Sequence, residues 1–201
     1  MTETLTRRDV LEQAHDALRT VVRGVPEQGW QLPTPCDQWT VAQVLQHAAG
    51  DQLGYASAIT GEPGPSYDPF APSGTLDEDA STVADRTTQA AATAWASVGD
   101  DVQDAPTPLP QGAMPAWLGS GACALDAAVH AWDIAVATGQ PSPLTPAVAA
   151  HLLTVATAIV EPLRAYGVYA AAFEPQPGDD EVAALLRYLG RRPEWTPGES
   201  R

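Results

Sequence analysis

Apolar residues return every three or four positions in four long stretches of this chain, and proline and glycine gather between them. In the first stretch Val10, Ala14 and Leu18 follow this spacing, which places them on one face of a helix. The alternating pattern of a half-buried strand is almost absent, and no internal repeat is present. The spacing predicts four long helices, over about residues 6–25, from 40 to the loop at 61, 75–98 and 119–138.

Capping signals mark the starts of the first two helices. Thr6 with Asp9, and Thr40 with Gln43, have the spacing of a capping box, in which each residue's side chain bonds the other's backbone. The third helix is expected to carry acidic residues in its first turn, where the helix dipole favours them. These residues are Asp77, Glu78 and Asp79.

The last sixty residues are also predicted to be helical. A fifth helix is expected from about Thr145, with Pro146 at its first position. Pro162 is expected to kink or break this helix, because proline lacks the backbone N–H. A short helix over about residues 180–189 closes the chain.

Two proline-rich connections, residues 61–74 and 99–118, separate the long helices. Loops of this length are uncommon in compact domains and often carry function. The length of 201 residues fits one domain. We therefore expect an all-α protein, a four-helix bundle with extra C-terminal helices, forming a single domain over residues 1–201.

The chain is strongly acidic, with a formal charge of −15 and no lysine among its ten basic residues. Such a chain repels phosphate backbones, so no nucleic-acid partner is expected. Neither a signal peptide nor a continuous apolar run of membrane-spanning length is present, so no membrane partner is expected. The two cysteines form no CxxC pair. These features favour a cytoplasmic protein with reduced thiols.

Asp126 and His130 are the side chains with the clearest chemical meaning. They lie four positions apart in a predicted helix, so they share one face, one turn apart. Leu125 and Val129 beside them are apolar, and a carboxylate and an imidazole that face inward need a partner. A cation is one such partner, and His47 on the second helix could complete its ligand set. The alternative is a buried Asp–His pair without a metal.

Two imidazoles and one carboxylate suit zinc, nickel or iron(II), and they leave a coordination position for water or substrate. Asp133, three residues beyond His130, could orient an imidazole, or it could be a solvated or packing residue. His15 and His151 have no partners at a telling spacing. We interpret them as surface or packing histidines.

The remaining candidates have ordinary structural interpretations. Cys36 and Cys123 have no histidine at a telling spacing, and we interpret them as small buried hydrophobes. Four aromatic residues lie on or near the connections, and we interpret them as ordinary core or loop packing, with the rim of a site as the alternative. They are Trp39, Tyr55, Tyr67 and Trp117.

Three motifs carry a family resemblance. The first is TPCDQWTVAQVLQHAAG, residues 34–50, which resembles the TPC-x-x-W-T-x-x-x-L-x-x-H stretch of the mycothiol-dependent maleylpyruvate isomerase-like, DinB-type metal-binding proteins of actinobacteria. The second is DAAVHAWDIAVATG, residues 126–139, which is similar to their E-x-x-x-H-x-W-D-x-A-x-A-T-G. The third is LLRYLGRRPEW, residues 185–195, which resembles their closing L-x-x-x-L-G-R-x-P-x-W.

The resemblance implies a DinB-like four-helix bundle that holds a divalent metal near one end. His47 matches the first family histidine and His130 the second. Asp126 stands where the family often has glutamate, and this shorter side chain would bind from a slightly different helix position or through a water. The implied ligands are therefore His47, Asp126 and His130, with zinc expected first and nickel or iron as alternatives.

The family's founding activity implies that a low-molecular-weight thiol, mycothiol, is brought to the metal and attacks an electrophile as its thiolate. The characterised isomerase carries a separate C-terminal domain with an essential arginine, and residues 140–201 are too short and too helical to form that domain. We therefore expect transfer of the thiol to another small electrophile.

The alternative function is a non-catalytic metal-binding scaffold or regulatory module. An open coordination position beside a roomy pocket would favour the transferase, and a closed coordination sphere would favour the scaffold. Related bundles often dimerise, so a homodimer is among the expected states.

Overall fold

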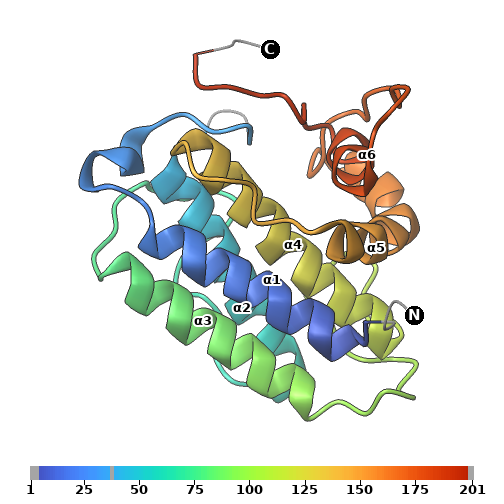
Figure 1. The fold of residues 1–201 in the computed structure, drawn as a ribbon. Coiled ribbons are helices and arrows are strands. Elements are labelled where there is room, and N and C mark those ends of the chain that lie inside the picture. Colours follow the sequence, from blue (N-terminus) through green and yellow to red (C-terminus); the bar gives the residue numbers. More distant parts are fainter. Residues whose placement is uncertain (1–4, 37–38, 199–201) are drawn as a thin grey trace.

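The computed structural model describes residues 5–36 and 39–198, and in this part the regular structure is helical (Figure 1). Residues 37–38, in the middle of the TPC-x-x-W motif, lie outside the described part, as do both chain ends. The bundle helices are α1 (Arg7–Arg23), α2 (Val41–Thr60), α3 (Ala80–Ala96) and α4 (Ala116–Ala137). Each of α1 and α2 packs against both α3 and α4. The all-α, DinB-like expectation is confirmed.

The two additional helices stand to one side of the bundle (Figure 1). Helix α5 (Pro146–Arg164) packs on α4, and α6 (Glu181–Tyr188) packs on α5. Gly121 permits the close approach of α5 to α4, because a Cβ atom at this position would lie 2.5 Å from Cγ2 of Val155. The C-terminal residues therefore reach the bundle through its most buried helix.

The expected capping boxes are present at both helix starts. The Thr6 hydroxyl accepts a hydrogen bond from the Asp9 amide, and the Asp9 carboxylate accepts one from the Thr6 amide at 2.8 Å. Thr40 and Gln43 exchange the same pair of bonds at the start of α2. Pro146 occupies the first turn of α5, as expected.

The structure differs from two local predictions. Helix α3 begins at Ala80, because the Asp79 carboxylate caps the Thr82 amide at 2.9 Å, so Asp77 and Glu78 precede the helix. Pro162 does not break α5, which continues to Arg164; a proline in the last turn removes only one of the final hydrogen bonds. A short 3₁₀ helix, η1 (Glu27–Gln31), follows α1.

Helix α4 is the centre of the molecule. Of its 22 residues, 18 are buried, because α1, α2 and α5 cover it from different sides. Alanine and glycine along its length let these neighbours approach closely. Any ionisable side chain on α4 therefore needs a partner inside the protein.

Helix α5 has the length and mean hydropathy, 1.5, of a segment that could cross a membrane, and 44% of that stretch is buried inside the protein. It packs against α4 and α6. A core helix has the same length and composition, so these two properties do not distinguish a membrane span from the packing that the structure shows.

Candidate metal centre

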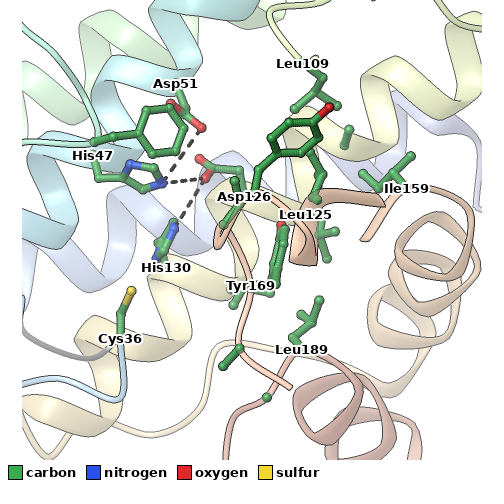
Figure 2. A pocket seen from close by; sticks show the side chains of 18 of the residues that line it. Cys36, His47, Asp51, Leu109, Leu125, Asp126, His130, Ile159, Tyr169 and Leu189 are labelled. Carbon is green, nitrogen blue, oxygen red and sulfur yellow. Dashed lines mark ion pairs between the residues drawn. The ribbon is translucent and has the colours of Figure 1, made fainter. Parts of the chain in front are cut away.

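The structure brings together the three residues that the sequence singled out. His47 comes from α2, and Asp126 and His130 come from the adjacent α4 (Figure 2). Oδ1 of Asp126 lies 3.5 Å from Nε2 of His47 and 3.4 Å from Nε2 of His130. All three donor atoms lie within 4.8 Å of one another. The two helices therefore direct two imidazoles and a carboxylate toward one point.

The other nitrogen of each imidazole is held by a hydrogen bond. Nδ1 of His47 lies 3.0 Å from the carbonyl oxygen of Pro69, and Nδ1 of His130 lies 2.9 Å from Oδ2 of Asp133. Both acceptors assign the N–H to Nδ1, which leaves Nε2 facing Asp126. This is the usual arrangement of metal-ligating histidines, in which a second group fixes the tautomer and the ring orientation.

A close approach between α2 and the following loop makes the Pro69 contact possible. Gly50, one turn after His47, packs against the proline ring, and a Cβ atom there would lie 2.7 Å from Cγ of Pro69. The rings of Trp39 and Phe70 also contact His47, with centroids 4.7 and 5.2 Å away. The imidazole is therefore fixed by packing as well as by its hydrogen bond.

Asp133 orients His130, which is one of the two interpretations that the sequence left open. Its carboxylate is fully buried and accepts two hydrogen bonds from Arg191, from Nε and from Nη2, each 2.8 Å long. Burial alone would raise the pKa of Asp133, but the Arg191 guanidinium holds it below its usual range. Sequence reasoning missed Arg191, although it lies in the closing LGRRPEW motif.

Asp126 has a buried hydrogen-bond network behind it. Nε2 of Gln52 donates to Oδ2 of Asp126 at 3.3 Å, while Oε1 of Gln52 accepts from Nε2 of His15 and from the Cys123 thiol at 2.8 and 3.0 Å. His15 is therefore a buried packing histidine, and Cys123 is buried as expected. Neither the Gln52 partner nor its link to α1 was visible in the sequence spacing.

Electrostatics in the cluster are dominated by its carboxylates. Burial alone would raise the pKa of Asp126, but the two neighbouring imidazoles hold it well below its usual range. Burial would likewise lower the pKa of His130, yet Asp126 and Asp133 raise it to about 10. In the absence of another cation, the buried carboxylates thus favour a proton on His130.

A second carboxylate, that of Asp51, also faces the cluster. It lies four residues after His47 on α2, with Oδ2 3.8 Å from Nε2 of that histidine. Burial, reinforced by the Asp126 charge, raises the pKa of Asp51 to about 7. The same four-residue spacing that singled out Asp126 and His130 could have found this pair.

A cavity of about 850 Å³ opens beside the cluster. His47, Asp126 and His130 all line it, together with Arg191 and Cys36. Of the four aromatic residues considered for a rim, Trp39 and Tyr55 line this cavity, whereas Tyr67 and Trp117 lie outside its lining.

Cys36 is only partly buried, and its thiol lies within 4.8 Å of donor atoms of His130 and Asp133. These three residues form a second group of potential ligands. The group is less suited to an ion, because Nδ1 of His130 and both oxygens of Asp133 already have partners. Burial, followed by the Asp133 charge, raises the pKa of the Cys36 thiol, which disfavours its thiolate.

Comparison with known proteins identifies the family. The family model described as the mycothiol maleylpyruvate isomerase N-terminal domain matches residues 11–135, which is more than half of the chain. The chain belongs to this family. The matched span includes His47, Asp126 and His130, and the resemblance inferred from the motifs is confirmed.

A relative and a solved structure extend this comparison. An uncharacterized protein of Mycobacterium tuberculosis, found in two strains, is 32% identical over 190 residues, which cover 90% of this chain and 94% of the relative. A crystal structure of a mutant mycothiol-dependent maleylpyruvate isomerase superposes with a TM-score of 0.51 at 19% identity. That match covers 67% of this chain and 63% of the isomerase, and it shows a shared fold.

Proposed function

We propose that this protein binds one divalent metal ion, with zinc as the first choice, through His47, Asp126 and His130. Two donors at about 2.0–2.1 Å from a tetrahedral zinc lie about 3.4 Å apart. The two separations from Asp126 Oδ1 to the imidazole Nε2 atoms are 3.5 and 3.4 Å. This agreement is the observation that carries the proposal, since N–H···O hydrogen bonds prefer about 2.7–3.2 Å.

Charge supports the same proposal. Asp126 and Asp133 are buried or nearly so, and Arg191 balances one of them. The second carboxylate needs a positive charge, which either a proton on His130 or a bound cation would supply. The fixed Nδ1 bonds of both histidines favour the cation, because they leave two Nε2 lone pairs directed at one point.

The protein would use this site as a thiol-dependent transferase. A bound dication lowers the pKa of a coordinating thiol and so supplies the nucleophilic thiolate. Three protein ligands leave a position open, and the cavity of about 850 Å³ beside them has room for a thiol and a small electrophile. This room favours the transferase over a non-catalytic scaffold.

Mycothiol is the thiol that we propose, because the family description names it. Different residues of this chain would bind the ion and orient its ligands. His47, Asp126 and His130 hold the ion, while Pro69 and Asp133 orient the two imidazoles. We place the reaction in the cytoplasm, where low-molecular-weight thiols stay reduced.

Metal analysis of protein purified without a metal-affinity tag tests the site. We expect about one zinc ion per chain in the wild type and its loss in His47→Ala and in His130→Ala. His151→Ala is the control, because this histidine lies on α5 outside the cavity lining. Unchanged metal content in the first two variants would reject the proposed ligand set.

Turnover is tested separately with the zinc-loaded protein. We expect zinc-dependent consumption of mycothiol in the presence of an electrophile from a broad panel, with bacillithiol as a second thiol. If no thiol is consumed faster than with the metal-free protein, the transferase is rejected and the metal-binding scaffold remains.

A further inference from the structure

The cavity beside the metal centre has two chemically different ends. Its charged side chains, Asp51, Asp126 and Arg191, lie with the two imidazoles at one end. Arg191 belongs to this end because it bonds Asp133, which bonds His130. Figure 2 shows His47, Asp51, Asp126 and His130 grouped on one side of the cavity.

The opposite end is formed by aliphatic side chains from four parts of the chain. Figure 2 shows Leu109, Leu125, Ile159 and Leu189 on that side, with Tyr169 between the two groups. They come from the loop before α4, from α4 itself, from α5 and from the end of α6. We call this part the apolar chamber and define it by Leu109, Leu125, Ile159, Leu163 and Leu189.

Three tyrosines line the cavity, Tyr55, Tyr166 and Tyr169, and Tyr166 is largely exposed to solvent. Tyr55 is only 2% exposed, and Tyr55 and Tyr169 both line the cavity. Neither hydroxyl has a hydrogen-bond partner among the described residues. Burial raises the pKa of both groups, which keeps them protonated as donors. Both hydroxyls can therefore donate to an acceptor that a ligand or water brings into the cavity.

We infer that the apolar chamber binds the electrophile, and that this electrophile is an uncharged, largely apolar molecule with a hydrogen-bond acceptor such as a carbonyl oxygen. This inference rests on the proposed function and names its substrate class. A charged group in the chamber would lose its hydration without gaining a counter-ion. A carbonyl oxygen would accept a hydrogen bond from Tyr55 or Tyr169, while the apolar remainder contacts the aliphatic wall.

Paired probes of one size test the inference on the zinc-loaded wild type. The probes are 2-acetylnaphthalene, which is neutral and carries one carbonyl, and naphthalene-2-sulfonate, which has the same ring and a negative charge. We expect 2-acetylnaphthalene to bind at least about tenfold more tightly, measured by fluorescence titration. Equal affinities, tighter binding of the sulfonate or no binding of either probe would overturn the inference.

Two substitutions at Leu109 test whether 2-acetylnaphthalene binds in the apolar chamber. Leu109→Glu introduces a charge at a partly exposed loop position of the chamber, so it should fold, and Leu109→Met is its apolar control. We expect the first to weaken 2-acetylnaphthalene by about tenfold and the second to leave its affinity within about twofold. If Leu109→Glu folds, as judged by circular dichroism, and binds like the control, the chamber assignment is wrong.

The hydroxyl contribution has its own test. Tyr55→Phe and Tyr169→Phe should weaken 2-acetylnaphthalene and leave 2-ethylnaphthalene, which lacks the carbonyl, unchanged. An equal effect on both compounds in both variants would refute the role of the hydroxyls. The same titrations on metal-free protein separate the two proposals, since probe binding there tests the chamber alone and zinc analysis tests the metal site alone.

Discussion

Arg191 donates two hydrogen bonds to Asp133, one to each carboxylate oxygen and each 2.8 Å long. Asp133 in turn accepts a bond from Nδ1 of His130. The segment after α6 is thereby joined to a proposed metal ligand through a single buried carboxylate. Arg191, in the closing motif, therefore supports the site.

Replacing Asp133 by asparagine tests this connection. Asp133→Asn keeps the shape of the side chain but removes the charge that orients His130 and balances Arg191. We expect zinc affinity to fall by roughly 10- to 100-fold, the usual effect of losing such a supporting residue. Competition with a chromophoric chelator measures it.

A carboxylate paired with another arginine is the control. Asp179 accepts from Nε of Arg187 near α6, outside the cavity lining. Asp179→Asn should leave zinc affinity unchanged. An equal loss in both variants would show that global stability, and not the orientation of His130, sets the affinity.

Gly50→Ala should weaken zinc binding through the Pro69 carbonyl. The added Cβ would lie 2.7 Å from Cγ of Pro69, so the loop must move away from α2 and from Nδ1 of His47. We expect roughly a tenfold loss of zinc affinity. Gly54→Ala on the same helix is the matched control.

A Cβ at Gly54 would meet nothing closer than 3.6 Å. Alanine has the higher helix propensity, so Gly54→Ala should be neutral or more stable by up to about 1 kcal/mol, with zinc affinity unchanged. Thermal unfolding and chelator competition measure the two quantities. Unchanged zinc affinity in Gly50→Ala would contradict a role for the Pro69 contact.

Asp126 and Asp51 both lie near His47, and substituting each in turn tests which carboxylate binds the metal. Asp126 lies close to Nε2 of both histidines, whereas Asp51 lies 3.8 Å from Nε2 of His47. We expect Asp126→Asn to lower zinc affinity strongly and Asp51→Asn to lower it far less, because only Asp126 lies between the two imidazoles. Isothermal titration of metal-free protein measures both, and the reverse order would assign the ligand to Asp51.

His15 should make stability depend on pH. Burial lowers its pKa from 6.5 to about 4, so between these values the unfolded chain binds a proton that the native protein does not. The contribution of His15 is therefore present above pH 6.5 and is lost as the pH falls toward 4. Between these pH values, this one group changes the unfolding free energy by up to about 1.4 kcal/mol per pH unit.

The comparison with His15→Gln isolates this effect from Asp51, whose raised pKa acts in the opposite direction. We expect the wild type to lose about 2 kcal/mol of unfolding free energy relative to the variant when the pH falls from 6.5 to 4.5. Urea unfolding in a chelator measures it. A difference that is constant with pH would show that His15 titrates normally.

Local sequence signals were sufficient for most helices. The capping pairs Thr6–Asp9 and Thr40–Gln43 act over three residues, and the apolar spacing of each helix acts over a few turns. Asp126 and His130 share a face for the same reason. The start of α3 was misplaced because the three acidic residues were expected in its first turn, whereas Asp79 caps the helix by accepting from the amide of Thr82.

The sequence by itself determined that the chain is helical, where most helices begin, and which carboxylate and imidazole share one turn of α4, because these properties depend on residues close together in the chain. Only the tertiary structure decided that His47 meets them, that Pro69 and Arg191 support the cluster from distant parts of the chain, and that an apolar chamber opens beside it. Those contacts join residues far apart in sequence, and no local spacing encodes which of them the packing of α2, α4 and α5 brings together.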